Sequence, residues 1–179
     1  MNDDFVLIKE IVIENPPTYY QIKKVKKSKE AGEDVYDKYY LTSNLFFNNA
    51  TSFHIISKIV YDCKLFLRDK IVYLPPLEKM RLEIEIHTSK HIDLDNRSYF
   101  WKKLLLDILK TPTQRQLAKE SKKEPKYQKE IITLNVIHDD TTQYIDDIRE
   151  TFKFGGNFLI FRIYGRAKSE QKCLDLFFK

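Results

Sequence analysis

Two short acidic motifs contain the residues of this sequence most suited to chemistry. Asp93 and Asp95 are separated by one residue in "HIDLDN", and Asp139 and Asp140 are adjacent in "HDD". If residues 91–95 are extended, the i, i+2 spacing places Asp93 and Asp95 on one face. Converging carboxylates repel one another unless a cation neutralises them. A set of oxygen ligands suits Mg²⁺ or Mn²⁺, which can polarise a phosphodiester and generate a hydroxide.

A purely structural interpretation of both motifs is also open. An Asp-x-Asp sequence before a helix often only caps that helix and complements its dipole. An aspartate pair after a strand is often part of a turn. Because the spacing within each motif does not show that the two motifs meet, the chemical interpretation depends on the elements around them.

Hydrophobic periodicity predicts the elements that must position the two motifs. A half-buried strand is predicted over 81–87, where apolar and charged residues alternate, and it leads into the first motif. A strand predicted over 131–140 ends in the second motif. The other predicted elements are a strand over 5–13, helices over 51–69 and 97–110, and a C-terminal β-hairpin over 142–165 with Gly155-Gly156 as its turn.

These signals predict a single α+β domain over residues 1–179, with a mixed β-sheet and helices packed on one side. Strand and helix patterns do not alternate strictly, and the last three predicted strands have no helix between them. Residues from about 111 to 130 are polar and basic, and we interpret them as an insertion in this domain.

The charge distribution indicates a polyanionic partner without proving one. The formal net charge is +5, and lysines cluster at 23–29 and 119–129. Either cluster alone is compatible with a solvated loop. If the protein binds DNA, the candidate DNA-binding residues are Lys23, Lys24, Lys26, Lys27, Lys122, Lys123 and Lys126.

The chain lacks the features of an exported or membrane-spanning protein. No apolar run approaches the roughly 20 residues that a membrane helix needs, and the N-terminus has no signal-peptide pattern. Cys63 and Cys173 are the only cysteines, so a disulfide framework is not expected. We therefore expect a soluble, cytoplasmic protein with no membrane partner.

The motifs and their order resemble the RusA family of Holliday junction resolvases. The resemblance rests on "DLDN" at 93–96, a lysine-containing helix with an Asp-x-Leu, and "HDDTTQYI" at 138–145. "NPPTYY" at 15–20 is similar to the Pro-rich segment after the family's first strand. The resemblance implies a homodimeric, magnesium-dependent endonuclease that cuts four-way DNA junctions in a bacterium or a phage-infected host.

The resemblance also implies roles for individual residues. Asp93, Asp95 and Asp140 correspond to the family's metal ligands, with Asn96 and Asp139 as supporting residues. The family's catalytic lysine lies three residues after the asparagine, where this chain has Tyr99, and four before the helix aspartate, which here is Asp107. The second count leads to Lys103, with its neighbour Lys102 as the other candidate. The interval from Asn96 to Asp107 is 11 residues, longer than in the family by about one helical turn.

Two other functions are compatible with the same residues. The displaced lysine allows a non-catalytic DNA-binding protein on the same scaffold. If the aspartates are only caps and turns, the chain is a structural or interaction protein. Metal-dependent cleavage of a synthetic junction would distinguish a nuclease from a non-catalytic DNA-binding protein. Salt-sensitive DNA binding would distinguish a DNA-binding protein from a structural or interaction protein.

Overall fold

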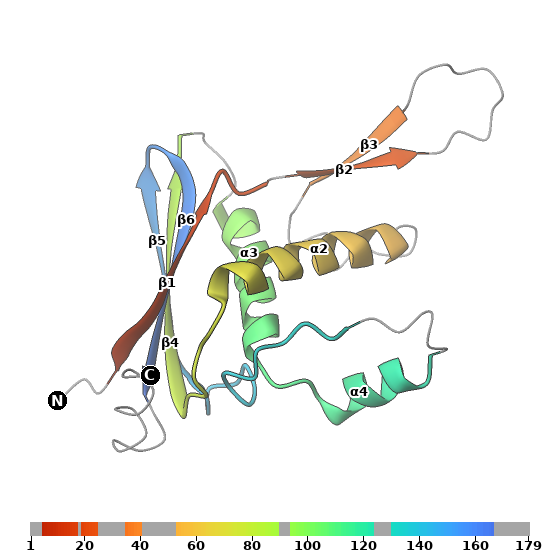
Figure 1. The fold of residues 1–179 in the computed structure, drawn as a ribbon. Helices are drawn as coiled ribbons and strands as arrows, with labels where there is room; N and C mark the ends of the chain where they lie inside the picture. The colour runs from red at the N-terminus through yellow and green to blue at the C-terminus, as the bar shows by residue number, and fades with distance from the viewer. Residues whose placement is uncertain are drawn as a thin grey trace.

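The computed structural model describes residues 5–17, 19–24, 35–40, 53–89, 94–123 and 130–166 (Figure 1). For residues 19–24, 35–40, 53–56 and 94–97 the description is of the backbone alone. The elements in chain order are β1 (Val6–Glu14), β2 (Tyr19–Lys24), β3 (Val35–Tyr40), α2 (Phe53–Ile71), β4 (Lys79–Thr88), α3 (Leu94–Leu109), α4 (Gln114–Ser121), β5 (Ile145–Phe154) and β6 (Asn157–Arg166).

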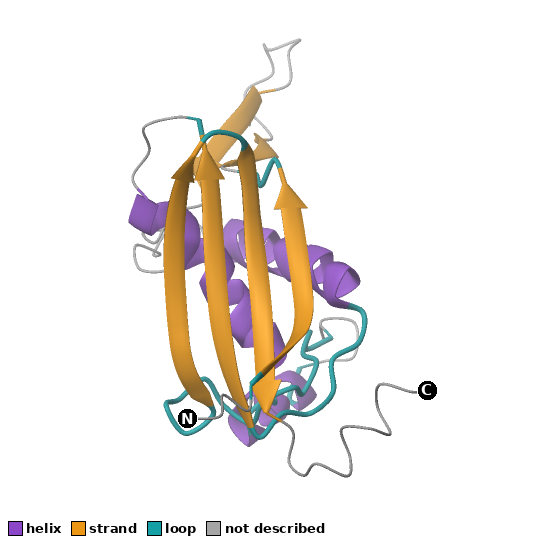
Figure 2. Ribbon diagram, turned by 90° about the vertical axis from the view of Figure 1, so that its left-hand side faces the viewer, coloured by secondary structure: helices purple, strands orange, loops and turns teal. Residues whose placement is uncertain are grey.

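The main sheet is mixed, which confirms the predicted α+β class. Its four strands lie in the order β1-β6-β4-β5, with β5 parallel to β4 and the other pairs antiparallel. Figure 2 shows the helices on one side of this sheet. β2 and β3 form a separate two-stranded ribbon, which extends away from the main sheet in Figure 1.

The central strand β4 shows why the sequence folds this way. Its residues alternate without exception between buried and partly exposed positions, as the apolar-charged alternation predicted. Leu82, Ile84 and Ile86 are completely buried and join one core with residues of α2, α3 and β6. Burial of this apolar face against helices is what stabilises a layered α+β domain.

The predicted C-terminal hairpin is wrong in its pairing. β5 and β6 are joined through Gly155 and Gly156, as expected, but they are not hydrogen-bonded neighbours, because β4 lies between them. The connection passes across the end of β4, where the Gly155 N–H donates to the Thr88 carbonyl at 2.9 Å. Both glycines have positive φ, 109° and 76°, which only glycine adopts easily.

The predicted strand over 131–140 is also corrected. Within this range the only described β-pairing is an isolated bridge between Lys110 and Ile137. The segment instead lies against the end of α3, where the N–H groups of Leu134 and Val136 donate to the Ile108 and Leu109 carbonyls at 2.6 and 2.8 Å. The last carbonyls of a helix have no partner within the helix, so this segment satisfies them.

The helices lie close to their predicted positions, and one further helix, α4, lies in the basic insertion. α3 begins three residues before the predicted start, and α2 is shifted by two residues. Thr113 caps α4 in a reciprocal capping box with Gln116. Among the described residues, no helix combines the length and apolar character that a membrane crossing requires.

Candidate functional site

Most of the predicted metal-binding side chains lie outside the described part of the chain. Asp93 is outside it altogether. Asp95 and Asn96 lie in the first turn of α3, directly beyond β4, but only their backbone is described. Asp139 and Asp140 are described, in the loop that leads to β5. The site can therefore be built from Asp140 and the residues around it.

The Asp140 carboxylate is held by two lysines of α3 and its immediate continuation. Its Oδ2 atom accepts a hydrogen bond from Lys110 Nζ at 3.2 Å and lies 3.6 Å from Lys103 Nζ. The Asp139 carboxylate accepts a hydrogen bond from the Asp140 N–H at 2.8 Å, which fixes the turn. The structure thus brings together Asp140, its supporting neighbour Asp139 and the candidate lysine Lys103.

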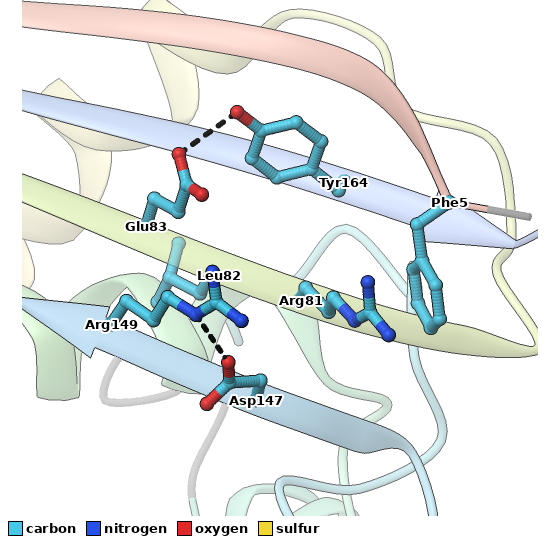
Figure 3. Close-up of a pocket in the computed structure, with 7 residues that line it drawn as sticks. All are labelled: Phe5, Arg81, Leu82, Glu83, Asp147, Arg149 and Tyr164. Carbon is cyan, nitrogen blue, oxygen red and sulfur yellow. Dashed lines mark hydrogen bonds and ion pairs between the residues drawn. The ribbon is translucent and has the colours of Figure 1, made fainter. Parts of the chain in front are cut away.

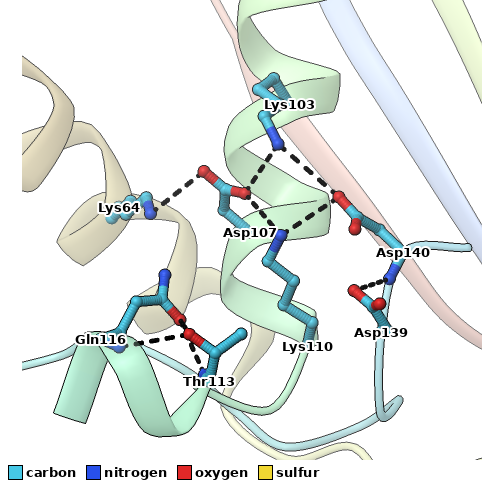
Figure 4. Close-up of polar contacts among 8 residues, drawn as sticks. All are labelled: Lys64, Lys103, Asp107, Lys110, Thr113, Gln116, Asp139 and Asp140. Atoms are coloured by element: carbon cyan, nitrogen blue, oxygen red, sulfur yellow. Dashed lines mark hydrogen bonds and ion pairs between the residues drawn. The ribbon is translucent and has the colours of Figure 1, made fainter. Parts of the chain in front are cut away.

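Asp107 links the same two lysines to a third. Its carboxylate lies 3.0 Å from Lys103 Nζ, 3.3 Å from Lys110 Nζ and 3.3 Å from Lys64 Nζ of α2. Figure 4 shows these side chains converging between α2, α3 and the loop of Asp140. We call Lys64, Lys103, Asp107, Lys110 and Asp140 the lysine–aspartate cluster. It contains three cations and two anions, so its positive charge exceeds its negative charge and favours binding of a further anion.

The cluster changes the proton affinities of its members. Burial acts to raise the pKa of Asp107, but the charges of Lys64, Lys103 and Lys110 outweigh it and hold that pKa below its usual range. Burial acts in the same way on Asp140, whose pKa is nevertheless lowered, chiefly by the hydrogen bond and charge of Lys110. Burial opposes the charge of Lys103, yet Asp107 and Asp140 raise its pKa. All three groups are therefore charged at neutral pH.

The two candidate lysines have different surroundings. Lys102 faces the sheet and is ion-paired with Glu150 of β5, whereas Lys103 points into the lysine–aspartate cluster. Of the two candidates, Lys103 is therefore the one that contacts an acidic residue of the predicted site whose side chain is described, Asp140. The residue reached by counting back from Asp107 is therefore the candidate lysine that lies beside Asp140, and its catalytic role stays a prediction.

Lys110 is a site residue that the sequence reasoning missed. It contacts both aspartates of the cluster, and its side chain is more buried than that of Lys103. A signal was present in the sequence, because Lys103, Asp107 and Lys110 have the i, i+4, i+7 spacing that puts residues on one helical face. Lys110 is the last residue of the helix predicted over 97–110, but nothing in the sequence places it beside the second acidic motif.

The described geometry separates the cluster from the first acidic motif. Lys103 follows Asp95 by eight positions on α3, which separates their Cα atoms by about 12 Å, or two helical turns, along the helix. The described side chains also contain no group of three or more His, Cys, Asp or Glu residues able to hold a metal. The Asp93 and Asp95 side chains are not among them, so the predicted metal site stays a prediction.

The predicted DNA-binding lysines are only partly described. Lys122 forms the C-cap of α4, and the next residue, Lys123, is ion-paired with Glu120 of that helix. Lys23 and Lys24 lie in β2, where only the backbone is described. Lys26, Lys27 and Lys126 lie outside the described residues.

A small hollow lies on the face of the sheet opposite the helices, and it does not resemble a reactive site. It has a volume of about 150 Å³ and is lined by charged residues of β4 and β5 (Figure 3). Arg81 donates to Asp146 at 2.7 Å, and Arg149 donates to Asp147 at 2.6 Å. Because the charges form close pairs along and across the strands, we interpret this face as a network of surface ion pairs.

Comparison with known proteins identifies no similar protein. No family model matches the chain, and no curated protein or solved structure matches it.

Proposed function

We propose that the protein is a metal-dependent endonuclease that cuts branched DNA such as a four-way junction. Asp93, Asp95 and Asp140 are the proposed ligands of Mg²⁺ or Mn²⁺. The observation that supports this most is the contact between Asp140 and Lys103, 3.6 Å apart. Asp140 belongs to the second acidic motif, and Lys103 belongs to α3, the helix that begins within the first. Such an enzyme would act in the cytoplasm, together with its DNA.

The described part of the site contains one suitable ligand for a hard cation and two lysines suited to a phosphate. Asp140 has a lowered pKa, so it offers an ionised carboxylate, the ligand type that Mg²⁺ prefers. When bound, the ion would supply an activated water for attack on phosphorus. Lys103 and Lys110 would bind the phosphate and stabilise the negative charge that develops on it during cleavage.

The proposal requires a rearrangement around Asp140. Its present partners Lys103 and Lys110 follow Asp95 by about two and about four helical turns, so a shared ion requires the Asp140 loop and the start of α3 to come closer together. Asp140 would then exchange Lys110 for the cation. This exchange is chemically reasonable, because the ammonium group of Lys110 neutralises the same carboxylate that would bind the ion.

We predict that Lys103 and its neighbour Lys102 differ sharply in importance. Lys103→Ala should lower the single-turnover rate of junction cleavage by about 10²-fold, the usual cost of removing one preorganised charge donor. Lys102→Ala should cleave close to the wild-type rate, because its Nζ is engaged by Glu150. The measurement is cleavage of an end-labelled four-way junction with Mg²⁺. Equal losses in both variants would contradict the assignment of Lys103.

A non-catalytic DNA-binding protein is the second candidate. The observation that favours it is the saturation of Asp140 by Lys103 and Lys110, away from Asp95. A protein of this kind would bind the junction and leave it uncut in Mg²⁺ and in Mn²⁺. The cleavage assay therefore decides between the two functions.

The basic segment should bind DNA through phosphates. We predict that neutralising Lys122, Lys123 and Lys126 together weakens junction binding without changing which DNA structure is preferred, because phosphate contacts position the protein without reading sequence. The dependence of affinity on salt should become shallower by about one unit of log–log slope for each lysine removed. Affinities measured at several salt concentrations test this. An unchanged slope would show that these lysines are solvated and do not contact DNA phosphates.

Paired cuts in a four-way junction require two active sites, so we propose that the chain acts as a homodimer. β5 is one candidate surface, because it is an edge strand of the main sheet. Phe152 and Phe154, on the helix side of the sheet, are 41% and 78% exposed. Both features suit an interface between copies.

We predict that Phe152→Ser/Phe154→Ser converts the dimer to a monomer at micromolar concentration, measured by light scattering. Tyr73→Ser is the matched control, because Tyr73 is 90% exposed and lies outside β5. If the wild-type protein is monomeric both free and on a junction, the dimer is refuted and at most a nicking enzyme remains. If the double variant stays dimeric, the interface lies elsewhere.

A further inference from the structure

A groove lies directly beside the lysine–aspartate cluster, on the side of the basic insertion. It has a volume of about 600 Å³ and is lined by α2, the end of α3, α4 and residues 130–133. Lys64, Asp107 and Lys110 belong both to the cluster and to the groove. The groove therefore extends from the residues proposed to contact the scissile phosphate.

One wall of the groove is apolar and contains an aromatic ring. Val60 and Tyr61 of α2 line it and pack against the core, and Ile132, almost fully buried, lines the opposite segment. A half-buried tyrosine beside aliphatic side chains offers a surface on which a planar ring can stack. The volume is within the range of pockets that bind small organic groups.

The charges of the groove favour an anion. Each lining carboxylate is already neutralised: Asp107 by the cluster lysines, Glu120 by Lys123, and Glu130 by Arg68 at 3.2 Å. Lys119 of α4 also lines the groove, and no carboxylate partner is found for it among the described residues. A phosphate could therefore bind at Lys119 without first breaking an ion pair, whereas Lys110 would share its ammonium group between the phosphate and Asp107 or Asp140.

Gln116 supplies an oriented hydrogen-bond donor. Its Oε1 atom accepts hydrogen bonds from the Thr113 N–H at 2.8 Å and from the Thr113 hydroxyl at 3.0 Å. These bonds fix the side-chain amide, so that its NH₂ group points away from Thr113, toward the side of Lys64 in Figure 4. A fixed amide donor of this kind can bind an acceptor on the edge of a nucleobase.

We propose that this groove binds one unstacked nucleotide of a single-stranded segment, with its base against Tyr61 and its phosphate at Lys119 and Lys110. The inference rests on the proposed action on DNA and names the part of a branched substrate that the site recognises. Unpaired nucleotides occur where strands exchange or fray. The groove would hold such a nucleotide next to the phosphate that is cut.

The test is binding of a fluorescently labelled oligonucleotide of eight thymidines, measured by anisotropy with EDTA present so that neither metal nor cleavage contributes. Tyr61→Ala should weaken binding by roughly tenfold, a typical loss for one stacked base. Lys119→Ala should weaken it several-fold and reduce the salt slope by about one. The controls are Tyr73→Ala and Lys58→Ala, which are exposed and lie outside the groove. An abasic oligonucleotide of equal length should bind the wild type and Tyr61→Ala equally.

Two results would contradict the proposal that the groove binds a nucleotide. One is wild-type affinity in both Tyr61→Ala and Lys119→Ala, and the other is an abasic strand that binds the wild type as tightly as the thymidine strand does. Lys119 is exposed on α4, so a folding defect in the Tyr61 variant does not leave the question open. Failure of the nuclease proposal can be distinguished from failure of the groove proposal. In that case the groove would still bind the oligonucleotide, while the junction stays uncut in Mg²⁺.

Discussion

Replacement of Asp95 by asparagine is expected to abolish Mg²⁺-dependent cleavage of a four-way junction, with a loss of roughly 10³-fold or more in single-turnover rate. The substitution removes one ligand charge from the proposed ion, whose stabilisation of the transition state is worth several kcal/mol. Junction binding should be kept or strengthened, because a negative charge near the DNA backbone is removed while the basic loops are untouched.

The same experiment with Asp140→Asn tests the second motif. We expect a comparable loss of cleavage, and binding that is again kept. Asp69→Asn is the matched control, since Asp69 is an exposed carboxylate on α2 whose described ion pair is with Arg68. Full cleavage by either site variant would rule out a role for that aspartate as a metal ligand. A loss in Asp69→Asn would show that any lost carboxylate has this effect.

The second large effect concerns the helix that carries the site. Trp101→Ala should lower the free energy of unfolding by about 3–5 kcal/mol, the usual cost of truncating a large aromatic residue in a core. Trp101 is 2% exposed and makes edge-on ring contacts with Phe66 of α2 and Phe100, at centroid distances of 6.1 and 5.5 Å. A loss of this size is a large share of the roughly 5–15 kcal/mol that a domain has.

Chemical denaturation followed by circular dichroism measures this change. Tyr73→Ala, at an exposed position, should shift the unfolding free energy by less than about 0.5 kcal/mol. If Trp101→Ala is as stable as that control, α3 is not anchored through Trp101. Lys103 lies two residues further along α3. If the substitution loosens this helix, the Trp101→Ala variant should therefore also cleave the junction more slowly than the wild type.

The strands and helices with regular apolar spacing could be predicted from the sequence. The alternation in β4 and the helical spacing in α3 reflect burial of one face, which is a local property of the sequence. The pairing of β5 with β4 is different, because a glycine pair permits both a hairpin and a connection across a third strand. The choice depends on β4, which is far away in the sequence.

Residues 131–137 show a second limit. Their β-branched residues are typical of a strand, but their N–H groups bond to the last carbonyls of α3 instead of a sheet. In the site, the step from Asp107 back to Lys103 led to the lysine beside Asp140. Lys110 was missed because its role arises from the return of the Asp140 loop to the end of α3.

The most direct test of the proposed metal site is a crystal structure of the protein soaked in Mn²⁺, with the anomalous signal used to locate the ion. We predict one Mn²⁺ peak bound by the carboxylates of both Asp95 and Asp140, at metal–oxygen distances of about 2.0–2.2 Å. Asp140 should then no longer contact Lys110. Asp140 still paired with Lys103 and Lys110, with no Mn²⁺ at either acidic motif, would contradict the proposal.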